Sequence, residues 1–399
     1  MKRPLEGIRV LSLTGALFGP FCGMLLADLG AEVIKVERPV LGDMNREWGP
    51  FFPGVTGPDK SGYYVSIHRN HKGITLNLRD PKGKEILKEL VKKSDVLIEN
   101  FKPGTLDEWE IGYEELKKVN PRLIYGCGSG FGHFGPYSRW PSYDIIGQAM
   151  GGFMDMNGWP DKPPCRAGSS IGDIISAMFL CIGILSALRY RELSGMGQKI
   201  DVAQQDSMLA VLENAVIRYT LEGKIPTRIG AKHPTITPFD IFKCNDGYVV
   251  IGGGNDAIFK RMCDAMGKTW IKDPRFDTNP HRTTNEAQLK PLIEEYTYDK
   301  TRWDVARLLL KNDVPSGPVY NVGEAVNDEH IKAREMIIEF DQPQYGKVRV
   351  AGCPIKMSET PIKIFTPAPL LGQHNEEVFT SILGYTKEQI AEFTKQGIC

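Results

Sequence analysis

The chain has 399 residues, about two to three times the length of a typical domain, so two domains are expected. Hydrophobic residues make up 41% and charged residues 25%, which is typical of a soluble globular protein and too apolar for a disordered one. Lys+Arg and Asp+Glu are 49 each, so the formal net charge is zero. A nucleic-acid or anionic-membrane partner would require a basic excess, and we expect neither.

The chain carries no pattern typical of export or of a membrane span. Its longest apolar stretch, residues 174–188, is shorter than the roughly 20 residues that cross a bilayer, so we expect a buried helix there. The N-terminal segment reaches Gly7 and Arg9 before any long apolar run, unlike a signal peptide. The eight cysteines include no Cys-x-x-Cys pair. We therefore expect a cytoplasmic protein with free thiols and no metal site.

The first half of the chain alternates strand and helix patterns. Strands are predicted over residues 8–13, 31–37, 95–99 and 122–125, with helices over 19–30, 81–93 and 113–119. Pro after Gly19 suits a first helical turn, and Gly30 suits a helix end. This alternation predicts a parallel sheet flanked by helices.

The pattern changes in the second half. Residues 151–172 are rich in Gly, Pro and Asn and predict a loop, followed by a long apolar helix, a strand over 199–203 and another helix. Cys244-Asn245-Asp246-Gly247 lies between two apolar runs and predicts a hairpin turn. Residues 227–322 are expected to form a smaller α+β domain, and residues 386–396 a helix.

Two other patterns predict no site. Gly130-x-Gly132-x-x-Gly135 matches a dinucleotide-binding fingerprint as text, but Pro136 follows where a helix should begin. His68 and His71 lie close together with no nearby carboxylate or thiol pair, so we expect them on a solvated surface.

Asp173 is an acidic residue in an unusual setting. It follows Ala-Gly-Ser-Ser-Ile-Gly and precedes the most apolar helix in the chain. A carboxylate in the first turn of a helix is favoured by the macrodipole and by free backbone N–H groups, so helix capping explains it simply. Ser169 and Ser170 can serve as caps, however, and a carboxylate nucleophile between flexible glycines is the alternative. From spacing alone the cap is favoured, and both explanations stay open.

Several segments taken together resemble the class III CoA-transferases, the family that includes formyl-CoA and carnitine CoA-transferases. They run in order along the chain: LFGPFCGMLLADLGAEVIKVERP, GITLNLRDPKGKEILKELVKKSDVLIENFKPG, YDIIGQAMGG, the GD of SSIGDIISAM, VVIGGGN and APLLGQHNEEVFTSILGY. Within the family the chain is most similar to the 2-hydroxyisocaproate and phenyllactate CoA-transferases of anaerobic amino-acid fermentation, which implies a role in leucine degradation.

The resemblance implies a mechanism and its substrates. Asp173 falls on the catalytic aspartate, which forms an anhydride with the acyl group and then an aspartyl-CoA thioester. An acyl- or enoyl-CoA is the donor and a small carboxylic acid, best represented by (R)-2-hydroxy-4-methylpentanoate (2-hydroxyisocaproate), is the acceptor. Coenzyme A thioester is thus a substrate, and no tightly bound cofactor is implied.

The resemblance also assigns binding residues. Gly252, Gly253, Gly254 and Asn255 match the loop that closes over the aspartate, as a flexible lid would. The positions that match the CoA-binding path are Ala16, Leu17, Phe18, Arg38, Leu76, Asn100, Phe101, Thr105 and Tyr143. Among them Arg38 matches a phosphate contact, for which a bidentate guanidinium is suited.

Three positions depart from the relatives. Leu17 replaces the glutamine of formyl-CoA transferase, which argues against formate or oxalate and for a more apolar acid. Glu108 stands where relatives often carry a basic residue, so one phosphate contact is in question. Tyr143-Asp144 replaces the His-Asp of α-methylacyl-CoA racemases; tyrosine, with a pKa near 10, is a poor acid/base group for racemisation. A racemase-like isomerase, a CoA-binding module without catalysis, and transfer to phenyllactate, carnitine, bile acid, formate or oxalate are the alternatives.

The fold implied is α/β, with a Rossmann-like large domain built from both chain ends, a smaller α+β domain, and an interlocked homodimer. The expected organisation is a large CoA-binding domain over residues 1–205, a linker over 206–226, the small domain with its glycine loop over 227–322, and a linker with the C-terminal part of the large domain over 323–399.

Overall fold

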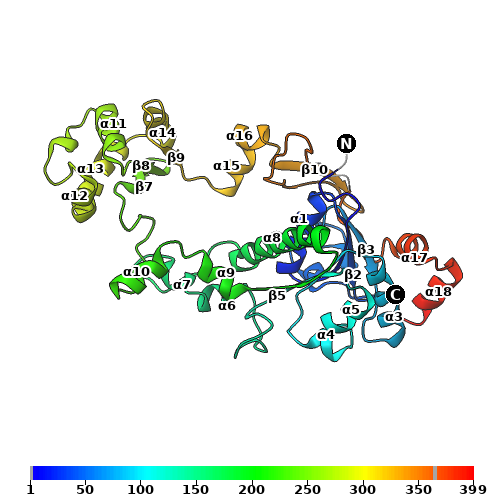
Figure 1. Ribbon diagram of the computed structural model, residues 1–399. Helices are drawn as coiled ribbons and strands as arrows, with labels where there is room; N and C mark the ends of the chain where they lie inside the picture. The colour runs from blue at the N-terminus through cyan, green and yellow to red at the C-terminus, as the bar shows by residue number, and fades with distance from the viewer. Residues whose placement is uncertain (1–2, 363–365) are drawn as a thin grey trace. The chain divides into compact units, whose positions relative to one another are not determined.

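The computed structural model describes residues 3–362 and 366–399, and the chain divides into two compact units (Figure 1). Unit 1 combines residues 3–153, 166–216 and the described part of 333–399, and unit 2 combines residues 154–165 and 217–332. Unit 1 thus takes its residues from both ends of the chain, whereas unit 2 comes mainly from one continuous stretch.

Unit 1 is built on a six-stranded parallel sheet. Its strands are β1 (Arg9–Leu13), β2 (Glu32–Glu37), β3 (His71–Thr75), β4 (Val96–Glu99), β5 (Ile124–Ser129) and β6 (Lys199–Ala203). Their order is β3-β2-β1-β4-β5-β6, and every neighbouring pair is parallel. This is the strand order of doubly wound dinucleotide-binding folds, which confirms the Rossmann-like architecture.

Helices cover both faces of this sheet. On one face lie α1 (Phe18–Asp28) and α8 (Ile171–Ser194), and on the other lie α3 (Pro81–Lys92), α5 (Tyr113–Val119), α17 (Asn375–Leu383) and α18 (Lys387–Lys395) (Figure 1). Strand residues alternate between the two cores: Val10 packs with α1 and α8, and Leu11 packs with α3. The remaining helices of the first half are α2 (Gly62–Ile67), α4 (Thr105–Glu108), α6 (Asp144–Met150), α7 (Phe153–Met156), α9 (Gln204–Ala210) and α10 (Ala215–Glu222).

Unit 2 contains a three-stranded antiparallel sheet of β7 (Phe239–Cys244), β8 (Gly247–Gly252) and β9 (Ser316–Pro318). Cys244 pairs with Gly247, so the predicted hairpin turn is confirmed. The helices that follow β8 are α11 (Asp256–Met266), α12 (Asn279–Thr284), α13 (Glu286–Thr297), α14 (Arg302–Leu310), α15 (Val322–Asn327) and α16 (Glu329–Ala333). A separate hairpin, β10 (Ile337–Gln342) with β11 (Gly346–Ala351), belongs to unit 1.

The long helix expected to begin near residue 172 is confirmed as α8. It has 24 residues, more than the apolar stretch 174–188, because polar residues continue it at both ends. By length and composition it is the one helix among the described residues that could cross a membrane. One face of α8 is nevertheless buried against the sheet: its residues Ala177, Leu180 and Ile184 belong to the hydrophobic core, as expected for a helix that packs on a sheet.

His68 and His71 do not lie on a solvated surface, so that expectation was wrong. Both are buried, and each ring donates a hydrogen bond from Nδ1–H: His68 to the carbonyl of Tyr64 at 2.9 Å, and His71 to the carbonyl of Arg69 at 2.8 Å. Burial lowers the pKa of His71 to about 4. The error arose because β3, HKGIT, lacks the apolar alternation by which strands are identified. The expected linker 206–226 consists largely of α9 and α10.

Candidate active site

Asp173 lies in the first turn of α8, but it does not cap that helix in the described structure. Ser170 at the N-cap makes no side-chain capping bond either. The backbone N–H of Gly172 donates instead to Oδ1 of Asp144 at 2.8 Å, so α6 supplies the cap. The carboxylate of Asp173 accepts a hydrogen bond from Nε2 of Gln204, the first residue of α9. The capping explanation therefore does not account for Asp173.

Asp173 has an unusual protonation equilibrium. Burial, followed by the negative charge of Asp144, raises its pKa to about 7, while the bond from Gln204 acts in the opposite direction. Asp144 is itself fixed by two bonds from Nε2 of Gln148, at 2.8 and 3.0 Å, and lies 3.8 Å from Nε of Arg166. A carboxylate that ionises near neutrality and carries no structural bond to its own helix has the properties expected of a nucleophile.

The loop after β1 reaches the same place. Leu17 packs with Met24 and Ile67, and Ile174, the residue after Asp173, packs against this group together with Tyr63. Burial and the charge of Asp173 raise the pKa of Tyr63 to about 12. The predicted residue Leu17 is thus brought next to the start of α8, although its side chain is itself buried.

The loop Thr14–Phe18 is held in one conformation. Asn100 bonds Gly15 on both sides, with Oδ1 accepting from its N–H and Nδ2 donating to its carbonyl, each at 2.8 Å. Ala16 takes a left-handed φ of 61°, and its N–H donates to Oδ1 of Asp43 at 3.2 Å. Asn100 therefore acts on the loop, in addition to any contact with CoA that the resemblance implies.

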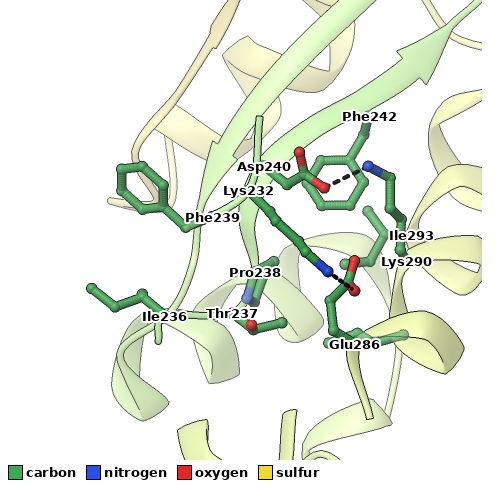
Figure 2. Close-up of a pocket in the computed structure, with 11 residues that line it drawn as sticks. Lys232, Ile236, Thr237, Pro238, Phe239, Asp240, Phe242, Glu286, Lys290 and Ile293 are labelled. Atoms are coloured by element: carbon green, nitrogen blue, oxygen red, sulfur yellow. Dashed lines mark hydrogen bonds and ion pairs between the residues drawn. The ribbon is translucent and has the colours of Figure 1, made fainter. Parts of the chain in front are cut away.

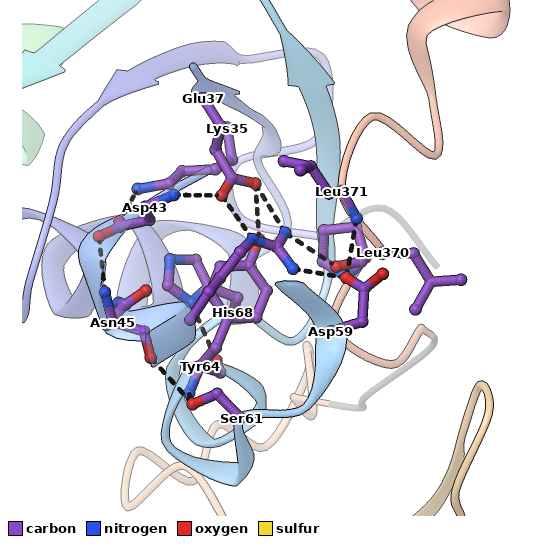
Figure 3. A network of polar contacts seen from close by, with 12 residues as sticks. Lys35, Glu37, Asp43, Asn45, Asp59, Ser61, Tyr64, His68, Leu370 and Leu371 are labelled. Atoms are coloured by element: carbon purple, nitrogen blue, oxygen red, sulfur yellow. Dashed lines mark hydrogen bonds and ion pairs between the residues drawn. The ribbon is translucent and has the colours of Figure 1, made fainter. Parts of the chain in front are cut away.

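A buried ion-pair network, part of which Figure 3 shows, contacts this loop. Lys35 donates to the carbonyl of Thr14 and to Oδ2 of Asp43, the latter at 2.6 Å. Arg46 donates two hydrogen bonds to the carboxylate of Glu37, from Nε at 2.6 Å and from Nη2 at 2.7 Å. Burial alone would raise the pKa of Glu37, but the guanidinium of Arg46 outweighs it and holds that pKa below its usual value. The network fixes the end of β2, directly before Arg38.

Apart from Tyr143, the predicted CoA positions lie where four neighbouring parallel strands end. Residues 16–18 follow β1, Arg38 follows β2, Leu76 follows β3, and residues 100–105 follow β4. Open α/β sheets bind ligands at these carboxyl ends. Arg38 is exposed, and Phe101 and Thr105 are partly exposed.

Two of the predicted CoA positions differ sharply in exposure. Leu76 is 1% exposed and belongs to the core, so only its backbone is available to a ligand. Tyr143, before α6, is 63% exposed. The binding roles of all these residues stay predictions.

Glu108 has a cationic neighbour from another segment. Nη1 of Arg139 lies 3.3 Å from Oε1 of Glu108 and donates to the carbonyl of Pro103 at 2.7 Å. A Cβ on Gly104 would lie 2.0 Å from that same Nη1, so the guanidinium lies directly on the turn before Thr105. Relatives often carry a basic residue at position 108. In this chain the positive charge of Arg139 lies beside Glu108 and offsets its negative charge.

The glycine run lies in unit 2 and is firmly anchored. Gly253 donates to the carbonyl of Pro238 at 2.7 Å, and Nη2 of Arg282 donates to the carbonyl of Gly254 at 2.8 Å. The guanidinium of Arg282 is fully buried and also bonds Thr237 and Asp256. These hydrogen bonds hold the glycine run more firmly than is expected of a mobile lid. Closure of the run over Asp173 stays a prediction.

Beside the run, residues 236–242 and α13 line a narrow pocket (Figure 2). Two ion pairs cross it, Lys232 with Glu286 at 2.8 Å and Lys290 with Asp240 at 2.5 Å. Because these charges are already paired with one another, the pocket offers no free charged group to a ligand.

Sequence reasoning missed a second polar cluster, at the ends of β4 and β5. Ligand atoms of Glu99, Cys127 and His133 lie within 4.8 Å of one another. Lys199 lies 3.1 Å from Nδ1 of His133, the thiol donates to the carbonyl of Ile200 at 3.1 Å, and burial and Glu99 raise the pKa of that thiol. A nearby cation and a protonated thiol do not suit a metal ion, and we assign none here.

Comparisons with known proteins identify the family of the chain. The model of CoA-transferase family III matches residues 5–375. Succinyl-CoA–D-citramalate CoA-transferase of Chloroflexus aurantiacus is 42% identical over 392 residues, 98% of this chain and 96% of that protein. Succinate–glutarate CoA-transferase of Agrobacterium fabrum is 37% identical over 384 residues, 96% of each chain.

A solved structure, a CAIB/BAIF family protein from Brucella suis, is 40% identical with a TM-score of 0.85 and covers 96% of this chain and 100% of that one. These relatives bear the names of citramalate and glutarate, and not of 2-hydroxyisocaproate. A family model across most of the chain, together with relatives of this identity and coverage, leaves one conclusion: the chain belongs to CoA-transferase family III and is a CoA-transferase that acts on carboxylic acids.

Proposed function

We propose that the chain transfers CoA from a succinyl-CoA-like donor to a small dicarboxylic acid, with Asp173 as the covalent nucleophile. The observation that carries the proposal is the state of Asp173: a largely buried carboxylate at a helix N-terminus whose capping need is already met by Asp144, and whose pKa is raised to about 7 by burial. At neutral pH a large share of the enzyme holds the anion needed for attack.

The reaction has four steps, each a nucleophilic acyl substitution. An oxygen of Asp173 attacks the donor thioester carbon; the C–S bond breaks, CoA leaves as thiolate, and an aspartyl-acyl anhydride remains. The thiolate attacks the carbonyl carbon of Asp173 and expels the donor acid as a carboxylate, leaving aspartyl-CoA. The acceptor carboxylate attacks that thioester and releases thiolate again, and the thiolate finally takes the acceptor acyl group and frees Asp173. No net proton, oxidant or ATP is required.

The side chains around Asp173 suit such intermediates. Leu17, Ile174 and Tyr63 form an apolar wall next to the carboxylate, which limits access of water to a hydrolysable anhydride. The fixed loop Thr14–Phe18 presents its backbone beside this wall without needing to reorganise.

A dicarboxylic acceptor is supported by a cation at the start of the helix that carries Asp173. Arg166 bonds the carbonyl of Gly168 and Oγ of Ser170 at 3.4 Å, which keeps its guanidinium at the start of α8. Its side chain is 42% exposed and lies 3.8 Å from Asp144, so it has free donors for the second carboxylate of an acceptor. Relatives named for citramalate, mesaconate and glutarate act on acids of this class.

2-Hydroxyisocaproate is the second candidate, because the apolar wall of Leu17 and Ile174 suits a branched alkyl group. A panel of acceptors tested against succinyl-CoA separates the two candidates. Our proposal expects citramalate, mesaconate or glutarate to exceed 2-hydroxyisocaproate in kcat/KM by at least tenfold. The reverse order would refute it. Arg166→Gln is expected to weaken dicarboxylic acceptors selectively.

The covalent role of Asp173 is tested by trapping. Incubation with succinyl-CoA and hydroxylamine is expected to convert the activated carboxyl to a hydroxamate on the peptide containing Asp173, as mass spectrometry would show. A hydroxamate on another carboxylate, or substantial activity in Asp173→Asn, would refute the assignment. A racemase is tested separately: it would exchange the α-proton of an acyl-CoA with deuterated water in the absence of any acceptor acid.

The homodimer and the cytoplasmic location belong to the same proposal. Five large apolar residues of α8 are exposed although the helix packs on the sheet: Met178, Phe179, Ile182, Tyr190 and Leu193. A second copy of the chain would cover such a face, as the interlocked dimer implies. All eight cysteines are free thiols, which suits a reducing compartment.

A further inference from the structure

Gln204 contacts Asp173 directly and is not among the site residues expected from the sequence. It begins α9, immediately after β6, and its residue is only 4% exposed. Its Nε2 donates to Oδ1 of Asp173, and its Oε1 accepts from Oγ of Ser142 at 2.9 Å. Both ends of the amide are thus engaged by side chains.

We propose that Gln204 is an oxyanion donor for the transfer reaction, holding Oδ1 of Asp173 so that Oδ2 attacks the thioester. The inference rests on the proposed nucleophilic role of Asp173. Two steps take place at the carbonyl carbon of Asp173: the thiolate attacks it in the anhydride, and the acceptor carboxylate attacks it in aspartyl-CoA. In both steps that carbon becomes tetrahedral and Oδ1 takes the negative charge. The same N–H then stabilises the developing oxyanion, and no proton moves.

The surroundings keep this amide in one orientation. Since the hydroxyl of Ser142 donates to Oε1, the NH₂ end is directed at the carboxylate, and a flipped amide would place two oxygens against each other. α6 prevents the side chain from moving away: a Cβ on Gly147 would lie 2.6 Å from Cβ of Gln204. A donor that is already fixed costs no reorganisation during the reaction.

Gln204 also opposes the other charges around Asp173. Asp144 of α6 disfavours the anion. Tyr63 of α2 is uncharged at neutral pH, as an ordinary tyrosine is, and burial raises its pKa further, to about 12. Arg166 is paired with Asp144, and Asp206 of α9 is exposed. Of the groups facing the carboxylate, Gln204 is the one that donates a hydrogen bond to it.

The test is Gln204→Leu, which keeps the size of the side chain and removes both bonds. Loss of one oxyanion donor typically lowers kcat by about 10²–10³, and we expect that fall with KM for the CoA donor nearly unchanged. The acid limb of kcat/KM is expected to move to higher pH by about one unit, because the anion of Asp173 loses its donor. Ser142→Ala is expected to lower kcat by about threefold to tenfold, since the amide is then free to turn.

The matched control is Gln205→Leu, one residue along the same helix turn, where Nε2 bonds only the carbonyl of Met150 at 3.1 Å. It is expected to keep both kcat and the pH profile. Thermal unfolding of Gln204→Leu must match wild type within a few degrees; if it does not, Ser142→Ala decides. A fall in kcat without movement of the acid limb, or wild-type kcat in Gln204→Leu, would overturn the inference. Activity in Asp173→Asn would instead refute the nucleophile, so the two failures are distinguishable.

Discussion

Replacing Asp173 by Asn is expected to make the protein more stable, and more so as the pH rises. The carboxyl has a pKa of about 7 in the folded chain against its usual 3.8, because it is buried next to Asp144. Between these values the native state holds a proton that the unfolded chain releases, so the unfolded state binds fewer protons and stability falls as pH rises. Asn carries no charge at any pH and keeps the oxygen that accepts from Gln204.

The magnitude follows from the two pKa values. One pH unit of difference corresponds to about 1.36 kcal/mol. The folded and unfolded values differ by about three units, so the raised pKa of Asp173 lowers the stability of wild type by about 2 kcal/mol at pH 5 and about 4 kcal/mol at pH 8. The Asn variant escapes this cost, so its advantage in free energy of unfolding should grow by about 2–3 kcal/mol between the two pH values and level off above the folded pKa.

Urea unfolding of both proteins at pH 5 and pH 8, with unchanged m-values, measures this difference. Asp206→Asn, an exposed carboxylate on α9, is the control and should change stability by less than about 0.5 kcal/mol at either pH. The reasoning fails if Asp173→Asn gains nothing between pH 5 and pH 8, or if it is less stable than wild type at pH 8.

Three further changes test the surroundings of the site. Arg46→Met leaves Glu37 buried without its partner and should lower the free energy of unfolding by about 3–5 kcal/mol, read from the urea midpoint. Arg38→Ala removes a charged contact worth about 1.5–3 kcal/mol, so KM for the CoA donor should rise about tenfold to a hundredfold with kcat unchanged. Gly254→Val should destabilise unit 2 by about 1–3 kcal/mol, measured by thermal unfolding, because a Cβ there would lie 1.9 Å from Cγ2 of Ile236.

Two of these changes have a control variant, and the third has an outcome that would contradict it. Lys118→Met breaks an exposed ion pair with Glu115 and should cost less than about 1 kcal/mol; a similar cost for Arg46→Met would contradict the role of the buried network. An unchanged KM in a folded Arg38→Ala variant removes Arg38 from the binding site. Gly252→Ala adds a Cβ at 3.5 Å from Pro315, an ordinary contact, so it should leave unit 2 stable and serves to test the loop's effect on turnover.

Local signals predicted the parts of the fold that depend on neighbours in sequence. Asp80 caps α3 through its bond to Lys82, and the helix predicted over 113–119 is α5 with the same bounds. Strand β3 was missed because its contacts are distant: Gly73 accepts a bond from the backbone of His374. A buried edge strand need not show alternation in its own five residues.

The same contrast applies to the site. Asp173 stood out because a carboxylate precedes an apolar helix. Its pKa, however, depends on Asp144 and its hydrogen bond on Gln204, which begin the helices α6 and α9. Only the rule that carboxyl ends of parallel strands meet gave a signal for Gln204, since it directly follows the predicted strand over 199–203. Pairing of Arg46 with Glu37 had no signal at all, because charged residues mostly lie on protein surfaces and the sequence alone does not bring these two together.

The covering of β3 by the C-terminal segment constrains how the protein emerges from the ribosome. Thr75 bonds Asn375, and Asn77 bonds the carbonyl of Ile398, so the open edge of the sheet finds its partners only after some 300 further residues. At about 5–20 residues per second, that interval lasts on the order of 15–60 s. During it β3 is an unpaired edge next to a largely complete sheet, which is the kind of surface that recruits a second nascent chain. In cells, slow translation or truncation near the C-terminus should therefore produce aggregates of the N-terminal half rather than a folded, inactive enzyme.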